Sequence, residues 1–433
     1  MRKRLRVRFL DTRPLRGSRA FRDLWIGTTV SQIGGQIANV AVLAQVWELT
    51  GSPVGTGAIG LATGLPMVLF GLLGGTLADA VDRRALVRAT TAGQLLAAMG
   101  LCAQALADNR SVLLLFALIA VGASCGALGA PARRTFPVRL LPGDQVAAGL
   151  ALNSISFQTA MLAGPAAAGL IIARWDFPAA YAVQAVAMAV SMLAVIRLPA
   201  MRPQAAGPAG TRRRPEPGGW RIFLRRPALW GAMATDLSAT LLAMPVALFP
   251  LVNEIRFGGN PQTLGLFLSA VAVGGITAGL LSGTVTRWRR SGLVQLSAAA
   301  VWGVALACFG LAGPLWLALG CLAVAGAADT VSVVTRSALV QLETPDAYRG
   351  RVSSVEHVIG VAGPELGNFR GGLMASATSA PFSLVFGGLS AVLAIAAVAV
   401  ANGPLRAYRT PSVAAKPATS ETAGVTPVAD EVG

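Results

Sequence analysis

Long uninterrupted apolar runs constrain this chain more than any other feature. Each run is close to the length that spans a hydrocarbon layer of about 30 Å at about 1.5 Å per residue. The twelve runs lie near residues 24–47, 55–78, 85–107, 111–130, 146–173, 178–197, 228–252, 262–285, 292–312, 315–334, 352–376 and 381–401. Charged residues make up 13% of the chain, about half their share in soluble domains. The pattern predicts an all-α polytopic membrane protein with 12 transmembrane helices.

The basic residues that give the net charge of +17 concentrate in every second loop, so they indicate the orientation of the chain in the membrane. Nine of them lie in residues 1–23 and eight in residues 197–226, whereas only Arg110, Arg174 and Arg256 fall in the alternate loops. Basic residues concentrate in cytoplasmic loops, so we expect a multi-pass plasma membrane protein with both termini cytoplasmic. The same charges favour contact with anionic membrane lipid over a nucleic-acid partner.

Residues for metal, cofactor or covalent chemistry are scarce. His357 is the single histidine, the four cysteines lie inside apolar runs, and no Gly-Lys-Ser/Thr phosphate loop is present. We therefore expect no metal site, no cofactor and no ATP hydrolysis by a P-loop. A membrane enzyme is disfavoured for the same reason. A non-transporting sensor is disfavoured because the tail is too short for a signalling domain.

Polar stretches divide the apolar runs into two sets of six. Trp220, Phe223 and Leu224 stand beside arginines in the central stretch and suggest a short helix on the inner leaflet. The predicted parts are a basic cytoplasmic arm (1–23), an N-terminal six-helix bundle (24–197), a cytoplasmic linker (198–227), a C-terminal six-helix bundle (228–409) and a disordered cytoplasmic tail (410–433).

Two passages recur at about half the chain length. Gly71 and Gly75 match Gly279 and Gly283 at an offset of 208, and RTFPVRL from Arg134 matches RSALVQL at an offset of 202. Two halves with the same orientation form a parallel repeat, in which the substrate path lies at the interface of the halves. The repeat therefore predicts two parallel six-helix bundles and a transporter.

The passage GTLADAVDRR, Gly75 to Arg84, resembles the signature between helices 2 and 3 of the major facilitator superfamily, Gly-x-Leu-Ala-Asp-Arg-x-Gly-Arg-Arg. It departs from that signature at Ala80 and Asp82, and the Asp-Arg-Arg variant resembles the enterobactin-exporter-like branch. Three further passages resemble that branch: LTGS (49–52), ETPDAYRGR (343–351) and GPELGN (363–368). The resemblance covers about residues 20–409 and implies an exporter of siderophores, drugs or macrolides.

The loop after the second run is a candidate gating motif. Gly71 and Gly75 would let a neighbouring helix approach closely, and the resemblance implies that Asp79 meets the N-terminus of helix 11. The remaining motif residues are Asp82, Arg83 and Arg84, and the two arginines would tie the turn to acids of the same half, with Asp144 a candidate. The alternative is a basic loop that only sets topology.

A polar stripe crosses the first run. Gln32, Gln36 and Asn39 are spaced at i, i+4 and i+7 and share one helix face. They suit a cavity that binds a polar ligand, and they suit contacts between helices nearly as well. Arg370 is a further cavity-lining candidate, although it could instead extend toward the outer interface.

Small residues and prolines mark candidate hinge and packing positions. Gly164, Pro165 and Gly169 resemble, with one residue too many, a motif of proton-coupled antiporters, and the alternative is an ordinary proline kink. Gly363 and Pro364 would loosen the eleventh helix.

Charged residues inside membrane spans are costly and indicate function. Asp236 and Glu365 are the candidate proton-coupling carboxylates, because a low-dielectric environment favours the protonated form. Asp329 and Arg336 share a helix face and are interpreted as a structural pair. We expect a monomeric proton antiporter that exports a small molecule, with a polar, siderophore-like substrate slightly favoured over multidrug or macrolide efflux because aromatic residues are few.

Overall fold

A computed structural model describes residues 11–199, 226–281, 290–345 and 348–409. Within these ranges the regular structure is entirely helical, as the apolar runs predict. The predicted linker helix at residues 220–224 and the tail at 410–433 lie outside the described residues, as does the side chain of Asp79.

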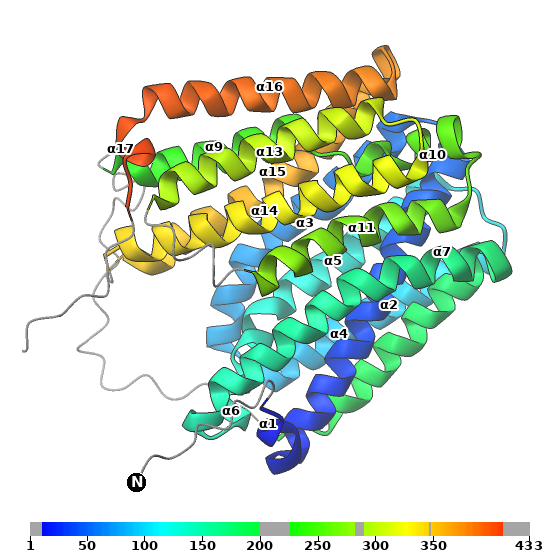
Figure 1. Ribbon diagram of the computed structural model, residues 1–433. Coiled ribbons are helices and arrows are strands. Elements are labelled where there is room, and N and C mark those ends of the chain that lie inside the picture. The colour runs from blue at the N-terminus through cyan, green and yellow to red at the C-terminus, as the bar shows by residue number, and fades with distance from the viewer. Residues whose placement is uncertain (1–10, 200–225, 282–289, 346–347, 410–433) are drawn as a thin grey trace, which may run out of the picture.

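The N-terminal half is formed by seven helical elements. They are α1 (Arg13–Gly17), α2 (Arg19–Thr50), α3 (Pro53–Ala80), α4 (Arg83–Leu106), α5 (Val112–Arg134), α6 (Phe136–Leu140) and α7 (Gly143–Ile196). Helix α7 contains two of the predicted runs and folds back on itself at Asp176, whose φ of 65° breaks the helical geometry (Figure 1). Both of its arms belong to the same bundle as α2, against which α7 packs extensively.

The C-terminal half contains α9 (Pro227–Ala243), η1 (Val246–Leu248), α10 (Phe249–Phe257), α11 (Pro261–Leu280), α13 (Ser291–Leu311), α14 (Leu315–Glu343), α15 (Arg349–Ala377), α16 (Ala380–Ala401) and α17 (Gly403–Arg406). The predicted run 228–252 is interrupted here. Helix α9 ends at Ala243 because Pro245 has no backbone N–H to continue the hydrogen-bond ladder. The path resumes as η1 and α10.

The helices have the length and composition of membrane spans. Nine helices in the described ranges are long and apolar enough to cross a membrane, and α7 alone is 54 residues long. Helices α2 and α15 are outside this set; they carry polar residues such as Gln32 and Glu365 within their length. The all-helical polytopic class is confirmed, and the count of twelve spans stays a prediction.

Short polar caps make the tight turns between antiparallel helices. Asp82 caps α4, because its Oδ1 accepts hydrogen bonds from the backbone N–H groups of Arg84 at 2.7 Å and Ala85 at 3.3 Å. Gly51 ends α2 with a φ of 55°, a left-handed conformation that glycine adopts without strain. These turns place neighbouring helices side by side within each half.

The two halves lie next to each other along their lengths (Figure 1). Helix α3 packs against α15, and α7 packs against α11, across the boundary between them. The helices α1, α6 and α17 lie on one side of the molecule in Figure 1, which we call the basic end. We call the opposite end, with the α2–α3 turn at Gly51 and Ser52, the far end.

Each half has its own buried centre. In the C-terminal half, the rings of Phe249, Phe267 and Phe309 are fully buried and meet edge to face at 5.5–5.6 Å. In the N-terminal half, the buried Tyr181 hydroxyl donates to Gln45 Oε1 at 2.7 Å, and Gln104 Nε2 donates to the same oxygen at 3.0 Å. Inside a membrane such bonds satisfy polar groups that lipid cannot.

Candidate functional site

A seam of glycines joins the halves at the far end. On α3, a Cβ added at Gly60 would lie 2.6 Å from the backbone oxygen of Glu365 and 2.8 Å from its Oε2. A Cβ at Gly64 would lie 2.8 Å from the Cβ of Glu365, and one at Gly57 would lie 2.9 Å from the backbone oxygen of Asn368. Side chains at these positions would force α3 and α15 apart, so this contact requires glycine.

Hydrogen bonds reinforce the same end of the boundary. The Thr56 hydroxyl donates to the Ala247 carbonyl at 2.7 Å, and the Ala247 N–H donates to Asn368 Oδ1 at 3.1 Å. The indole N–H of Trp47 donates to the Glu254 carboxylate. The Thr56 and Trp47 bonds join α3 and α2 to the C-terminal half, and the Ala247 bond holds η1 against α15 within that half.

Helices α7 and α11 make the second contact between the halves. The Ser269 hydroxyl donates to the Leu162 carbonyl at 3.0 Å, and a Cβ at Gly265 would lie 2.3 Å from the Pro165 carbonyl oxygen. A Cβ at Gly169 would lie 2.7 Å from the carbonyl oxygen of Pro261. Pro165 and Gly169, predicted as hinge or packing residues, therefore lie at a close interhelical contact. Their role as a hinge stays a prediction.

A cavity of ≈ 720 Å³ lies along the boundary and extends into the N-terminal half. Its polar residues from the N-terminal half are Gln32, Gln36, Asn39, Thr56, Thr63, Gln94 and Gln184. The C-terminal half contributes Val246, Ala247, Leu268, Glu365 and Asn368. The cavity is therefore lined from both halves, which is the position that a parallel repeat gives to a substrate site.

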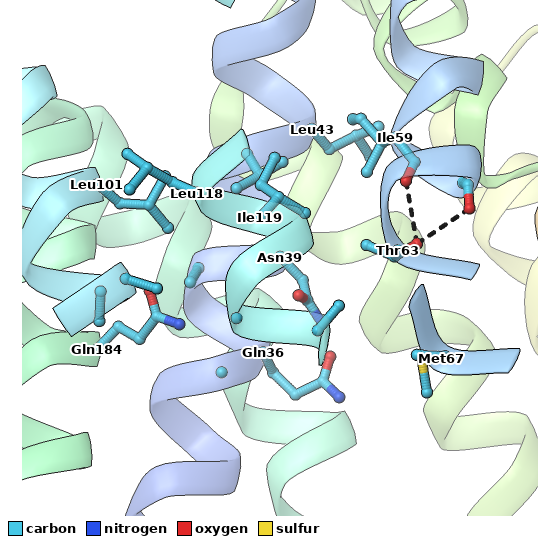
Figure 2. Close-up of a pocket in the computed structure, with 18 of the residues that line it drawn as sticks. Gln36, Asn39, Leu43, Ile59, Thr63, Met67, Leu101, Leu118, Ile119 and Gln184 are labelled. Carbon is cyan, nitrogen blue, oxygen red and sulfur yellow. Dashed lines mark hydrogen bonds between the residues drawn. The ribbon is translucent and has the colours of Figure 1, made fainter. Parts of the chain in front are cut away.

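The wall of the cavity has separate apolar and polar parts. Figure 2 shows Leu101, Leu118 and Ile119 gathered on one side, and the amides of Gln36 and Asn39 on another. Across from these amides, the Thr63 hydroxyl is bonded to the carbonyl of Ile59 at 3.0 Å (Figure 2). A cavity of this volume and mixed lining suits a drug-sized amphiphile.

Two glutamines of the lining have unused hydrogen-bonding capacity. In the part of the chain that the structure describes, the amide oxygens of Gln32 and Gln184 are buried and accept no hydrogen bond. Buried polar atoms without partners are rare and call for an explanation. A carbonyl oxygen that accepts no bond can accept one from a ligand when the side chain rotates, so these two residues are candidates for recognising polar groups.

The predicted stripe on α2 lies in this site. Gln32, Gln36 and Asn39 all line the cavity, and Gln36 Nε2 contacts Met161 Sδ at 3.0 Å. A Cβ at Gly164 would lie 2.4 Å from the Cβ of Gln36, so α7 approaches α2 closely behind the stripe. Whether a substrate contacts these amides stays a prediction.

Arg370 does not line this cavity, which corrects its prediction as a lining residue. Its guanidinium donates to the backbone carbonyls of Leu241 at 3.0 Å and Leu242, near the end of α9. The break at Pro245 leaves these carbonyls without helical partners, and a cation at a helix C-terminus also favours the helix dipole. Arg370 therefore stabilises the interrupted path from α9 to η1.

The second proton-coupling candidate, Asp236, lies outside the cavity lining. Its carboxylate on α9 forms an ion pair with Arg336 on α14, and Arg336 Nε lies 3.7 Å from Glu356 Oε1 on α15. Glu356 Oε1 also accepts a hydrogen bond from Ser337 at 3.0 Å. The expected pairing of Arg336 with Asp329 is corrected, because the ion-pair partner comes from another helix.

In this conformation the charged side chains of the loop at the basic end bond to the backbone at helix ends. Asp82 caps α4, and Arg83 Nε donates to the Ala78 carbonyl at 3.3 Å. Arg84 Nη2 donates to the Ile196 carbonyl at the end of α7, at 3.2 Å. The suggested acid partner, Asp144, lies instead 3.5 Å from Arg13.

The two glycines of the motif face open space here. A Cβ at Gly71 or Gly75 would meet no atom within 4 Å, whereas one at Gly74 would lie 2.7 Å from the Leu128 carbonyl oxygen on α5. The close helix approach in this region therefore occurs at Gly74. The predicted approach at Gly71 and Gly75 is not made in this conformation.

Helix α15 carries the last predicted packing positions. A Cβ at Gly363 would lie 2.5 Å from the Thr240 hydroxyl oxygen, so α15 and α9 are in close contact there. Pro364 lies within the continuous helix α15. Gly57, Gly60 and Gly64 are not among the predicted packing positions, although their spacing of three and four residues on one helix face is a recognisable packing pattern.

Two helical bundles that together enclose a cavity with apolar and polar walls are the architecture of a membrane transporter. Residues 12–426 match the family described as transmembrane secretion effector. The chain belongs to this family of the major facilitator superfamily, and it is a transporter, not an enzyme.

Two enterobactin exporters are similar to most of this chain. An enterobactin exporter of Citrobacter koseri is 26% identical over 419 residues, covering 94% of this chain and 96% of that protein. An enterobactin exporter of Shigella boydii serotype 18 is 25% identical over 402 residues, covering 90% of this chain and 94% of that protein. The expected resemblance to this branch is confirmed.

Solved structures show the same fold at low sequence identity. A POT family transporter in complex with 5-aminolevulinic acid has a TM-score of 0.71 at 10% identity, covering 90% of this chain and 97% of that one. A D-xylose-proton symporter has a TM-score of 0.68 at 14% identity, covering 87% and 96%. These similarities establish the major facilitator fold.

Proposed function

We propose that this transporter exports a small organic molecule across the plasma membrane by alternating access, driven by exchange for protons. The observation that carries the proposal is the cavity of ≈ 720 Å³ between the halves, together with the seam that closes its far end. Basic residues mark cytoplasmic loops, so the basic end is assigned to the cytoplasm. The conformation is then closed toward the exterior, as a state that loads substrate from the cytoplasm requires.

Glu365 is the proposed proton-coupling residue. It lines the cavity and packs against Gly60 and Gly64 in the seam, so the same side chain can respond to substrate and to closure. Asp236 is the weaker candidate, because its carboxylate is buried against Arg336 and does not line the cavity. Exchange requires a carboxylate that gains a proton on one side and loses it on the other.

The gate at the basic end would form in the opposite conformation. Gly71 and Gly75 have open space beside them, which α15 would fill when the cytoplasmic side closes. Asp79 would then meet the N-terminus of α15, and Arg83 and Arg84 would hold the loop. An Asp79→Asn variant at normal expression is expected to export more slowly, and an unchanged rate would remove the gate from the proposal.

Everted membrane vesicles provide the direct test. The first substrate to test is enterobactin, because the curated relatives are named as its exporters. We expect accumulation that requires a proton gradient and is lost when a protonophore collapses it. Accumulation that persists without the gradient would contradict proton exchange.

A matched pair of variants tests the coupling residue. Glu365→Gln removes the carboxylate from the cavity, and Glu48→Gln removes an exposed one on α2 that does not line it. We expect Glu365→Gln to lose gradient-driven accumulation while substrate exchange down its own gradient continues. Gradient-driven accumulation by Glu365→Gln at the rate of the control would exclude Glu365 as the coupling residue.

A further inference from the structure

The charge of the cavity wall restricts the substrate class. Among the described residues that line the cavity, Glu365 is the single ionisable side chain, and the other polar members are amides and hydroxyls. We propose that the cavity selects neutral or cationic amphiphiles, with Glu365 as the residue that recognises positive charge, and that it rejects anions. This inference rests on the proposed transport function and adds the charge of the substrate.

Two arginines of the neighbouring helices, Arg133 and Arg370, are held by other partners. Arg133 lies behind the lining, where its Nη2 donates to Gln94 Oε1 at 2.8 Å and to Thr91 Oγ1 at 2.9 Å. Arg370 is bonded to backbone carbonyls near the end of α9. Neither guanidinium lines the cavity, so an anionic substrate would find no described cation in contact and a carboxylate at the closed end.

The bond between Arg133 and Gln94 also sets the polarity of the wall. With its oxygen accepting from Arg133, the Gln94 amide keeps its NH₂ group as the part available to other partners. Glu365 can only accept hydrogen bonds while it is ionised. The lining therefore combines amides that bind neutral polar groups with one acceptor suited to an ammonium or another cation.

The apolar part of the wall selects for an amphiphile. Leu101, Leu118 and Ile119 face the same space as the Gln36 and Asn39 amides (Figure 2). A small hydrophilic ion would leave this surface without a partner and would not use the hydrophobic effect. A molecule with an apolar body and a neutral or cationic polar group fills both parts.

The test uses two probes that have the same shape and opposite charge. Tetraphenylphosphonium is a cation, and tetraphenylborate is its anionic counterpart, so size and apolar area are matched. Each is measured separately by equilibrium dialysis against the purified full-length chain in neutral detergent micelles, with protein-free micelles subtracted. We expect the cation to bind at least tenfold more tightly than the anion.

Three variants assign the preference to its residue. Glu365→Gln is expected to reduce the preference for the cation at least tenfold, and Glu365→Asp is expected to retain most of it because the charge remains. Glu48→Gln, which removes a carboxylate outside the cavity, is expected to keep the wild-type preference. If Glu365→Gln does not fold, the wild-type measurement still tests whether the cavity prefers the cation to the anion.

Equal binding of the two probes, a preference for the anion, or an undiminished preference in Glu365→Gln would each overturn the inference. The readout is binding, so it does not depend on transport. Proton-driven export of an anion in vesicles would overturn the charge assignment and leave the proposed function standing. A preference for the cation without any gradient-driven export would leave the charge assignment standing and overturn the proposed function.

Discussion

An alanine at Gly60 should open the far end of the transporter. The added Cβ would lie 2.6 Å from the Glu365 backbone oxygen and 2.8 Å from its Oε2. Ordinary contact begins near 3.4 Å, so α3 and α15 must separate by about 0.8 Å to accommodate it. Overpacking of this kind costs about 1–3 kcal/mol. The backbone oxygen cannot rotate away as a side chain could.

The cost applies to the closed far end and is relieved when the halves separate there. A difference of about 1–3 kcal/mol changes a two-state equilibrium by about 5- to 150-fold. The assay is the rate at which a membrane-impermeant thiol reagent, added outside cells, modifies Thr63→Cys in a background without the four native cysteines. Thr63 lines the cavity, so its accessibility from outside reports an open far end. We expect a rate increase within that range.

Two other glycines provide the controls. Gly320 on α14 is exposed and a Cβ there would meet no atom within 4 Å, so Gly320→Ala measures the gain in helix propensity alone. Gly71→Ala on α3 fits this conformation without a clash. In the proposed gate the added methyl group would hinder closure of the basic end, so this variant should lower the rate at which the external reagent modifies the cysteine. A rate for Gly60→Ala equal to that of Gly320→Ala would refute the reasoning.

Three further substitutions probe the rest of the structure by thermal unfolding in detergent. Arg336→Gln should lower the free energy of unfolding by about 3–5 kcal/mol, because Asp236 would be left buried and unpaired. The two side chains are only 7% and 8% exposed. Adding Asp236→Asn should recover most of the loss, and no recovery would contradict the pairing. Asp82→Ala should cost about 1 kcal/mol by removing the cap of α4, whereas Asp82→Ser should retain most of the stability. Tyr181→Phe should cost about 0.6 kcal/mol, the average for such bonds in membrane proteins, and a loss above 3 kcal/mol would show a wider role for the Gln45 network.

Local patterns were sufficient to predict the class of fold. The predicted run 381–401 corresponds to α16 (Ala380–Ala401), and the run 85–107 corresponds to α4 (Arg83–Leu106). Spacing along one helix also placed Gln32, Gln36 and Asn39 on a common face. The predicted run 228–252 differs from the structure, where the path breaks after Ala243. Two prolines in that run, Pro245 and Pro250, were the unused signal.

Properties that depend on neighbours along one helix could be predicted from the residues alone: which segments are apolar enough for a membrane, where charges interrupt them, and which residues share a face. Which helix each face meets is known only from the packed bundles. Glu365 packs against Gly60, Asp236 pairs with Arg336 in place of Asp329, and Arg370 turns from the cavity to the end of α9. The physical reason is that the periodicity of a helix fixes directions within it, whereas contacts across the boundary depend on how two whole bundles rotate and approach each other.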